Sequence, residues 1–214
     1  MFTGYQGWID GIRDWLDVDD YTDAQIASFL SLAQVRMNTD LMSSRMEKNT
    51  TLTIDGVDII PGEPVDLDTA IPDFSKIRLV IPSWAKKASD VAAINELLSY
   101  IASDAYYDDE LTYYAIDSMQ LHMYPPTREN GTIKILYYPI VPSISEELDE
   151  NIFTKYHSNM LLYACGLEAA PYMVEDERTT MWAEMYGVLV ENANTVVNKE
   201  KMGSVPLKRQ IRSL

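Results

Sequence analysis

The stretch "LLYACGLEAAPYMVEDERTTMWAEMY", Leu161–Tyr186, decides the fold of the C-terminal half of the chain. Apolar residues recur at helical spacing on both sides of Pro171, which has no N–H and cannot continue a helical hydrogen-bond ladder. The pattern predicts one helix from Phe153 to this corner and a second from about Asp176 to Asn198. In the second helix we expect five apolar residues to be buried: Met181, Trp182, Met185, Leu189 and Val196.

The residues of this corner could form a catalytic cluster or a structural elbow. The acidic residues 175–177 fall at the start of a helix, where negative charge complements exposed N–H groups. Arg178 is placed to pair with a carboxylate on a neighbouring helix, whereas Tyr172 and Trp182 are typical packing aromatics. Gly166, beside small alanines, permits close approach of a neighbour. Each residue has an ordinary structural role, so we interpret the corner as scaffold.

Two helices are predicted before residue 46. Tyr5–Leu16 has apolar residues at helical spacing. Thr22 and Gln25 form a capping-box pattern, which predicts a second helix that runs to about Arg45.

The middle of the chain, about 49–140, is predicted to be rich in strands. Asp55-Gly56 within "TLTIDGVDII" favours a tight hairpin turn, and "KIRLVI" (76–81) reads as another strand. A helix is predicted over Trp84–Ala105. "TYYAIDSMQLHMYP" (112–125) and "TIKILYYP" (132–139) alternate like paired strands around a Gly-containing loop.

These elements predict an α+β fold. Helices about 5–45 and 154–198 would form a helical bundle, with a small antiparallel β domain inserted between them. We assign residues 1–198 to one domain and 199–214 to a basic C-terminal arm.

The composition excludes several classes of protein. The net charge of −16 disfavours ordinary nucleic-acid binding, because affinity for phosphate backbones comes from Lys and Arg. A single cysteine, Cys165, cannot form an internal disulfide. We expect no signal peptide and no membrane span, and assembly from the cytoplasm.

The charge is unevenly distributed along the chain. Residues 199–214, "KEKMGSVPLKRQIRSL", hold five basic side chains and one acidic one, so residues 1–198 carry −20. A basic tail on an acidic body is typical of an arm that docks on an acidic surface, of another copy or of a different protein, although a solvated terminus has the same composition.

Candidate catalytic and metal-binding residues are few. His122 and His157 have no partners at ligand spacing, and Cys165 lies mid-helix among small apolar residues, where an inert thiol is expected. Residues 17–23, "DVDDYTD", resemble a calcium loop, but they lack its glycine and its bidentate glutamate. The carboxylates of residues 108–110 (Asp108, Asp109 and Glu110) could form a paired-carboxylate site, although a solvated loop is the simpler reading. We expect no enzyme, no cofactor and no metal.

The C-terminal segment "HSNMLLYACGLEAAPYMVEDERTTMWAEMYGVLVENAN" (157–194) resembles the signature of head-to-tail adaptor proteins of tailed bacteriophages, of the short-tailed type. The resemblance rests on the helix pair at the corner, whose matching residues include Gly166, Glu168, Pro171, Tyr172, Arg178 and Trp182. Residues 111–145 are similar to the family's hairpin, and "FLSLAQVRMNTDL" (29–41) is similar to its second helix. The similarity covers most of residues 8–198, whereas 82–110 and the tail after Lys199 depart from the pattern.

The resemblance implies a virion protein in the neck between capsid and tail, assembled in the host cytoplasm. Such a protein forms a ring, expected to be twelvefold, beneath the portal; it extends the DNA channel and receives a tail or nozzle protein. DNA would pass through its lumen without specific binding. We expect Lys208, Arg209 and Arg212 of the basic arm to dock on the portal. The alternatives are another tail or neck component, such as a tail-tube protein, or a carboxylate-based hydrolase.

Overall fold

The computed structural model describes residues 2–17, 20–57, 59–60, 62–103, 112–127, 130–173 and 177–202, and the side chains of these residues up to 195. The chain divides into two compact units, unit 1 (Met1–Met46 and Val141–Leu214) and unit 2 (Glu47–Ile140). Unit 1 is helical and unit 2 holds the strands, so the predicted α+β class is confirmed.

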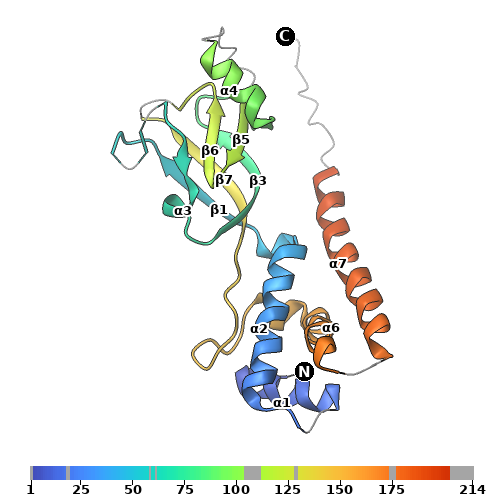
Figure 1. Cartoon of the computed structure of the whole chain (residues 1–214). Coiled ribbons are helices and arrows are strands. Elements are labelled where there is room, and N and C mark those ends of the chain that lie inside the picture. The colour runs from blue at the N-terminus through green and yellow to red at the C-terminus, as the bar shows by residue number, and fades with distance from the viewer. Residues whose placement is uncertain are drawn as a thin grey trace, which may run out of the picture. The chain divides into compact units, whose positions relative to one another are not determined.

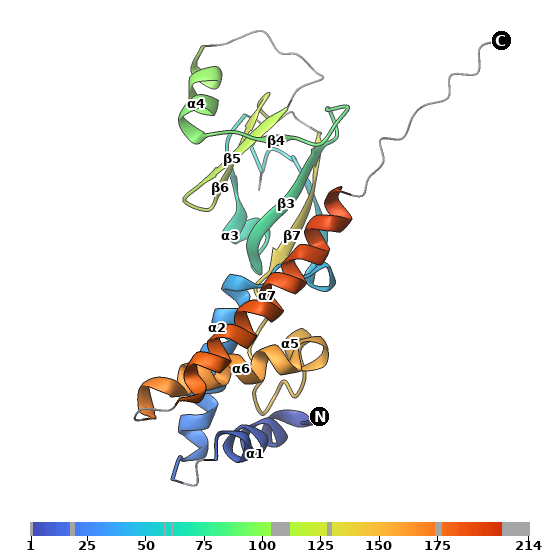
Figure 2. The same ribbon diagram turned by 90° about the vertical axis from the view of Figure 1, so that its right-hand side faces the viewer.

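In unit 1, the helix α6 packs against both α2 and α7 (Figure 1). The elements of this unit are α1 (Gly4–Leu16), α2 (Asp23–Asp40), η1 (Ser44–Met46), α5 (Ile152–Tyr156), α6 (Ser158–Ala169), η2 (Ala170–Tyr172) and α7 (Arg178–Met202). Figure 2 shows α7 as one unbroken helix. It continues past Asn198, so the predicted end of this helix is wrong by about one turn.

The helix α2 begins as predicted and ends earlier. The Thr22 hydroxyl accepts from the Gln25 backbone N–H, and the Gln25 side chain accepts from the Thr22 N–H, which completes the capping box. The helix stops at Asp40 and not near Arg45. The side chain of Asn194 on α7 donates to the Asp40 carbonyl at 2.9 Å and accepts from the Met42 N–H at 2.7 Å. The Asp40 carbonyl and the Met42 N–H therefore form their hydrogen bonds with a side chain of α7 and not within α2.

The helix predicted from Phe153 onward is two helices. His157, with φ −132° and ψ 31°, interrupts it between α5 and α6. Asn151 caps α5 by accepting from the backbone N–H groups of Phe153 and Thr154. The α-helix α6 ends at Ala169, before Pro171, as the sequence predicts.

Unit 2 contains two sheets and two short helices. Its elements are β1 (Lys48–Thr53), β2 (Val65–Asp66), α3 (Leu67–Ala70), β3 (Phe74–Pro82), β4 (Asp90–Val91), α4 (Ile94–Ala102), β5 (Tyr113–Asp117), β6 (Gln120–Tyr124) and β7 (Thr132–Pro139). The strand orders are β1-β7-β3 and β2-β6-β5-β4. The strand pairs are antiparallel, as predicted, except for the two-residue pair β4–β5, which is parallel.

Both predicted strand pairings in unit 2 are wrong: strands lie within 48–53, 112–125 and 132–139 as predicted, but the described residues directly after Asp55-Gly56 form no strand. β1 pairs with β7 and not with the residues after Asp55-Gly56. The Asp55 carboxylate accepts from the Val57 and Ile59 N–H groups and holds a local turn instead. The segment 112–125 folds back on itself as the hairpin β5–β6, with Ser118 and Met119 at positive φ. β6 and β7 therefore lie in different sheets.

The helix predicted over Trp84–Ala105 is shorter. It begins at Ile94, after β4, and Leu97 is its only fully buried residue. Leu98 and Ile101 are exposed by 43% and 38%. The main core of unit 2 lies between the strands instead, and includes Leu52, Ile54, Val65, Leu67, Val80, Leu121, Ile133 and Ile135.

Candidate assembly surfaces

The helix pair at the corner is held by a direct contact between Gly166 and Trp182. Trp182 is 1% exposed, and its ring lies over the backbone of α6. A Cβ atom at position 166 would lie 2.8 Å from Cε3 and 2.9 Å from Cδ2 of Trp182. Real Cβ atoms do not approach other atoms so closely, so this packing requires glycine.

The indole of Trp182 is also fixed by residues of α1 and α7. Trp15 lies 5.1 Å away, centroid to centroid, and its Cζ3 would be 3.1 Å from a Cβ at position 166. The guanidinium of Arg178 lies over the Trp182 ring at 5.1 Å and donates to the Leu16 carbonyl at 3.0 Å. A cation above an indole face is attracted by the ring quadrupole. The C-terminal end of α1, the middle of α6 and the start of α7 therefore converge on one side chain.

Polar side chains join α2 to α6 and α7. Glu168 on α6 pairs with Arg36 at 2.6 Å. The hydroxyl of Tyr186 on α7 donates to the Asp40 carboxylate at 2.9 Å. Burial, followed by this hydrogen bond, raises the pKa of Tyr186 well above its usual value. Arg36 and Asp40 lie in the segment 29–41 that resembles the family's second helix, but no sequence pattern indicates their partners, because such pairings are set by tertiary position.

Tyr172, an expected packing aromatic, is 60% exposed. Its ring lies 5.2 Å from that of Phe29 on α2, and its carbonyl accepts from the Tyr21 hydroxyl at 3.0 Å. Pro171 lies in η2, at the first positions of the 3-10 turn, where a missing N–H has little effect. Tyr172 therefore holds the corner through its ring and its backbone carbonyl, although its side chain is mostly exposed.

Two of the five residues expected to be buried on α7 are exposed. Met181 and Met185 are each 47% exposed, whereas Trp182 is buried and Leu189 is half-buried. The side chain of Val196 lies outside the described residues. Tyr186, which the sequence did not single out as buried, occupies the inner face of the helix with 7% exposure.

Burial determines the chemical state of Cys165, the candidate nucleophile, and of His157, a candidate base. Cys165 is fully buried, and burial raises the pKa of its thiol far above the usual range. Burial, followed by the charge of Arg45, lowers the pKa of His157, which favours the neutral imidazole. His122 lies half-buried on β6 in unit 2. The thiol is therefore inert, as the sequence predicts. The Nε2 atom of His157 is buried without a hydrogen-bond partner among the described residues.

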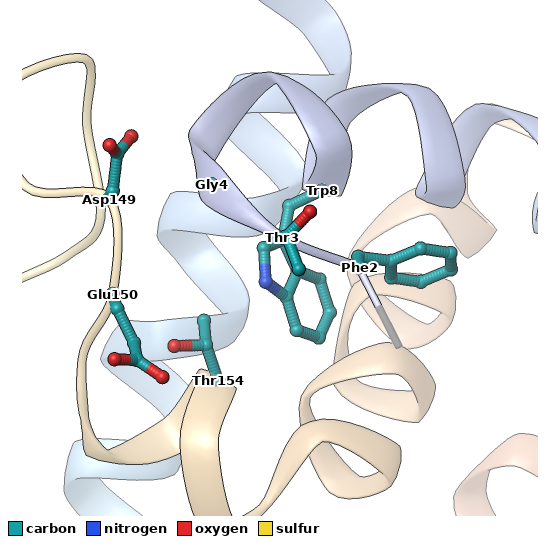
Figure 3. Close-up of a pocket in the computed structure, with 7 residues that line it drawn as sticks. All are labelled: Phe2, Thr3, Gly4, Trp8, Asp149, Glu150 and Thr154. Carbon is teal, nitrogen blue, oxygen red and sulfur yellow. The ribbon is translucent and has the colours of Figure 1, made fainter.

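A cavity of about 310 Å³ lies in unit 1 beside the start of α1. Figure 3 shows the carboxylates of Asp149 and Glu150 on the left, with the rings of Trp8 and Phe2 at the centre and right. Asp149 accepts from the Tyr5 N–H at 3.3 Å, and the Thr154 hydroxyl donates to the Asn151 carbonyl. These groups serve the starts of α1 and α5, and the lining holds no histidine, lysine or cysteine to act with them.

In unit 2, Lys48, Asp73 and Tyr137 form a polar triad at the side of the β1-β7-β3 sheet. Lys48 Nζ lies 2.6 Å from Asp73, and the Tyr137 hydroxyl donates to the same carboxylate at 2.8 Å. Burial would raise the pKa of Asp73, but the bonds from Lys48 and Tyr137 lower it below its usual value. Burial, then the hydrogen bond and charge of Asp73, raises the pKa of Tyr137 to about 12.

Several predicted site residues lie outside the described residues. They are the arm residues Lys208, Arg209 and Arg212, the carboxylates Asp108, Asp109 and Glu110, and the helix-start acids Glu175 and Asp176. Within the described ranges, no cluster of three metal-ligating side chains occurs. No helix in those same ranges has the length and apolar character needed to cross a bilayer.

Comparison with known protein families identifies the class to which this scaffold belongs. The model of the family described as SU10 adaptor protein matches residues 3–209, whereas no curated protein matches the chain. The chain belongs to the SU10 adaptor protein family. It is a bacteriophage head-to-tail adaptor, a structural class whose members interact with portal and tail proteins in the virion neck. The family resemblance inferred from the sequence is thereby confirmed.

Proposed function

We propose that this adaptor assembles as a ring beneath the portal, extends the DNA channel during genome ejection and presents the attachment surface for the tail. A portal of twelvefold symmetry would impose twelve copies. The family match over residues 3–209 carries this proposal, because it spans both units of the chain. Assembly in the host cytoplasm, before attachment of a tail or nozzle protein, follows from the same role.

The charge of the protein supports a channel through which DNA passes without being held. Residues 1–198 carry −20, and on α7 the exposed side chains that point away from Trp182 include Glu184 and Glu191. An acidic wall repels phosphates and offers no counterion release on contact with DNA. The same charge would also oppose association of free subunits, which favours ring closure on a template.

The basic arm is proposed as the element that reaches the portal. Its cations Lys208, Arg209 and Arg212 follow α7, which ends at Met202. Twelve residues of extended chain reach about 40 Å, enough to cross onto a neighbouring protein. Ordering of such an arm on binding offsets part of the binding energy. Its positive charges make docking sensitive to salt, because salt screens their attraction to an acidic surface.

The proposal is tested by the mass of the full-length protein, alone and mixed with purified portal rings, in native mass spectrometry or light scattering. We expect a portal ring to take up one full ring of adaptor, and tail protein to bind only the adaptor-bearing ring. A chain that ignores the portal yet binds the tail directly would identify another tail component. A chain that binds neither and hydrolyses a substrate would identify an enzyme.

The arm is tested separately by truncation after Met202, which leaves α7 intact. We expect loss of portal binding, with an unchanged helical circular dichroism spectrum. Replacing Lys208, Arg209 and Arg212 by glutamine should weaken binding and reduce its salt dependence. Replacing the exposed Lys86 and Lys87 of unit 2 gives a matched control of equal charge type. Undiminished binding by the truncated chain would refute the role of the arm.

A further inference from the structure

One flank of α7 exposes a line of large apolar side chains. Met181, Met185 and Val188 are 47%, 47% and 53% exposed, and their spacings of four and three residues place them one above another on the helix. The inner face of the same helix is already filled by Trp182 and Tyr186. The exposed line is therefore not a misplaced core face; it is a second apolar surface on a helix whose core face is occupied.

The opposite flank of α7 carries two small residues, Ala183 and Gly187, and the half-buried Val190 at matching positions. Ala183, Gly187 and Val190 each lie two residues after one of the large side chains. Two residues along an α-helix correspond to a rotation of about 200°, so the paired residues point to nearly opposite sides. One flank therefore projects at three positions, and the other is shallow at two of the matching positions, Ala183 and Gly187.

Among the described residues, no contact within its own subunit requires a glycine at position 187. A Cβ built at this position meets nothing within 4 Å, whereas one at Gly166 would collide with Trp182 and one at Gly11 with Phe2. A glycine inside a helix costs about 1 kcal/mol relative to alanine. Close packing explains Gly11 and Gly166, whereas a Cβ at Gly7 in α1 would meet only the Thr3 hydroxyl at 4.0 Å. At position 187, which lies between two exposed flanks, we take the missing side chain as a sign of close approach from outside the subunit.

We infer that the two flanks of α7 form the contact between neighbouring copies of this chain, with Met181, Met185 and Val188 of one copy packed on Ala183, Gly187 and Val190 of the next. This inference rests on the proposed ring and specifies its interface. The two contacting surfaces are different, so the interface is heterologous, which is the kind that generates a ring. A two-fold dimer would instead place each flank against its own counterpart.

The two flanks can meet in a closed ring without a rise from one copy to the next. Residues two apart differ by about 3 Å along the helix axis, at 1.5 Å rise per residue. When copies of α7 stand at the same height around an axis parallel to them, Met185 of one copy lies between the heights of Ala183 and Gly187 of the next. A step of about 3 Å per subunit would accumulate around the axis and give an open filament, so the ring requires this level arrangement.

The area of this contact explains why it needs a template. With 25 residues, α7 is about 37 Å long, and one flank about 10 Å wide gives roughly 370 Å² per partner. The total of about 700 Å² for two partners is well below the 1,200 Å² typical of a stable pair. A single contact is therefore weak, and the net charge of −16 weakens it further. Contacts on both flanks of every copy become stable together when the portal holds the copies side by side.

Disulfide trapping tests the interface directly. In the full-length double variant Met185→Cys/Gly187→Cys, the two thiols point to opposite sides of one helix and cannot bond to each other. The native Cys165 is fully buried and does not compete. We expect oxidation on portal rings to give a ladder of linked chains up to the full ring. Each single variant should stay monomeric in denaturing gels, because its thiol faces a position without a cysteine.

A steric variant tests the same contact without oxidation. Gly187→Leu fills the depression, and we expect at least a tenfold loss of adaptor taken up per portal ring, with monomer stability unchanged or increased. Glu184→Leu, which adds an apolar side chain to the outer side of the same helix turn, should bind like the wild type. Full uptake of Gly187→Leu would overturn the inference.

The outcomes separate the interface from the proposed function. If wild-type protein forms a ring on the portal but the double variant gives no ladder, the interface is wrong and the function stands. If wild-type protein does not join the portal, the proposed function is wrong. Oxidation of the free protein, at a concentration at which light scattering shows that the wild type self-associates, then decides the interface: a ladder supports it, and no ladder refutes it. Dimers from Met185→Cys alone would show a two-fold contact and also overturn it.

Discussion

Gly166 and Gly187 lie on adjacent helices, and alanine should change the stability of unit 1 in opposite directions at these two positions. At Gly166 the added Cβ would lie 2.8 Å from Cε3 of Trp182 and 3.1 Å from Cζ3 of Trp15. Trp182 cannot move aside easily, because it is 1% exposed and packed between Trp15 and Arg178.

The magnitudes follow from two opposing effects. Overpacking a filled site costs about 1–3 kcal/mol, whereas glycine to alanine inside a helix gains up to about 1 kcal/mol. With the full helix gain, Gly166→Ala should therefore destabilise the protein by up to about 2 kcal/mol. Gly187→Ala, with nothing within 4 Å of its Cβ, should stabilise the monomer by up to about 1 kcal/mol.

The assay is urea denaturation of the three proteins, followed by tryptophan fluorescence, since three of the four tryptophans (Trp8, Trp15 and Trp182) lie in unit 1. Combining Gly166→Ala with Trp182→Phe should cost less than the sum of the two single changes, by at least about 0.5 kcal/mol, because the smaller ring relieves the collision. Equal stabilities for the two alanine variants, or strict additivity in the double variant, would refute the reasoning.

Three further predictions concern single interactions. Thr22→Ala removes the hydroxyl cap of α2 and should cost about 1 kcal/mol in the same denaturation assay; an unchanged midpoint would contradict the capping box. Tyr186→Phe keeps the ring but deletes the 2.9 Å bond to Asp40, for an expected loss of about 1–2 kcal/mol, whereas Tyr172→Phe, at a side chain 60% exposed, should change stability by less than about 0.5 kcal/mol. Because the folded pKa of Tyr137 is raised from 10.0 to about 12, its contribution is complete below pH 10 and is lost as the pH rises toward 12; unfolding of unit 2 should therefore depend less steeply on pH in this window for Tyr137→Phe than for the wild type.

Local signals in the sequence predicted the elements that local interactions determine. The capping box at Thr22 and the break at Pro171 involve atoms only a few residues apart, so the start of α2 and the end of α6 were predicted correctly. The close approach at Gly166 was also expected. The contact of Gly166 with Trp182 was not expected, because Trp182 lies on a different helix, α7.

Pairing between strands could not be predicted in the same way. Asp55-Gly56 does form a turn, but the strand that joins β1 is β7, which begins nearly eighty residues further along the chain. The Ser118–Met119 turn has φ values of 49° and 62°, in the region favoured by glycine, although neither residue is a usual turn former there. A tertiary fold that places β5 and β6 together overrides this local preference.

The end of α2 shows the same limit for a helix. Apolar spacing continues to Leu41 and beyond, yet the helix stops at Asp40, where Asn194 takes over hydrogen bonds that the next turn would have made. The alternative partner lies on α7, more than 150 residues away in sequence. A helical apolar pattern indicates which residues tend to be buried. It does not indicate which atoms complete the backbone hydrogen bonds at the end of the helix.

The exposed line on α7 follows from this distinction. Met181, Met185 and Trp182 all fit an apolar helical pattern, and the sequence assigned them to one buried face. The structure separates them: Trp182 is covered by its own subunit, and the two methionines are not. Periodicity cannot distinguish burial within a chain from burial between chains, because both need the same apolar spacing. The two kinds of burial are distinguished by the surroundings of two glycines. A Cβ at Gly166 would collide with Trp182 of the same subunit, whereas a Cβ at Gly187 would meet nothing within 4 Å. In an adaptor that is stable as a subunit and weakly self-associating until it docks, one helix would need both kinds of surface.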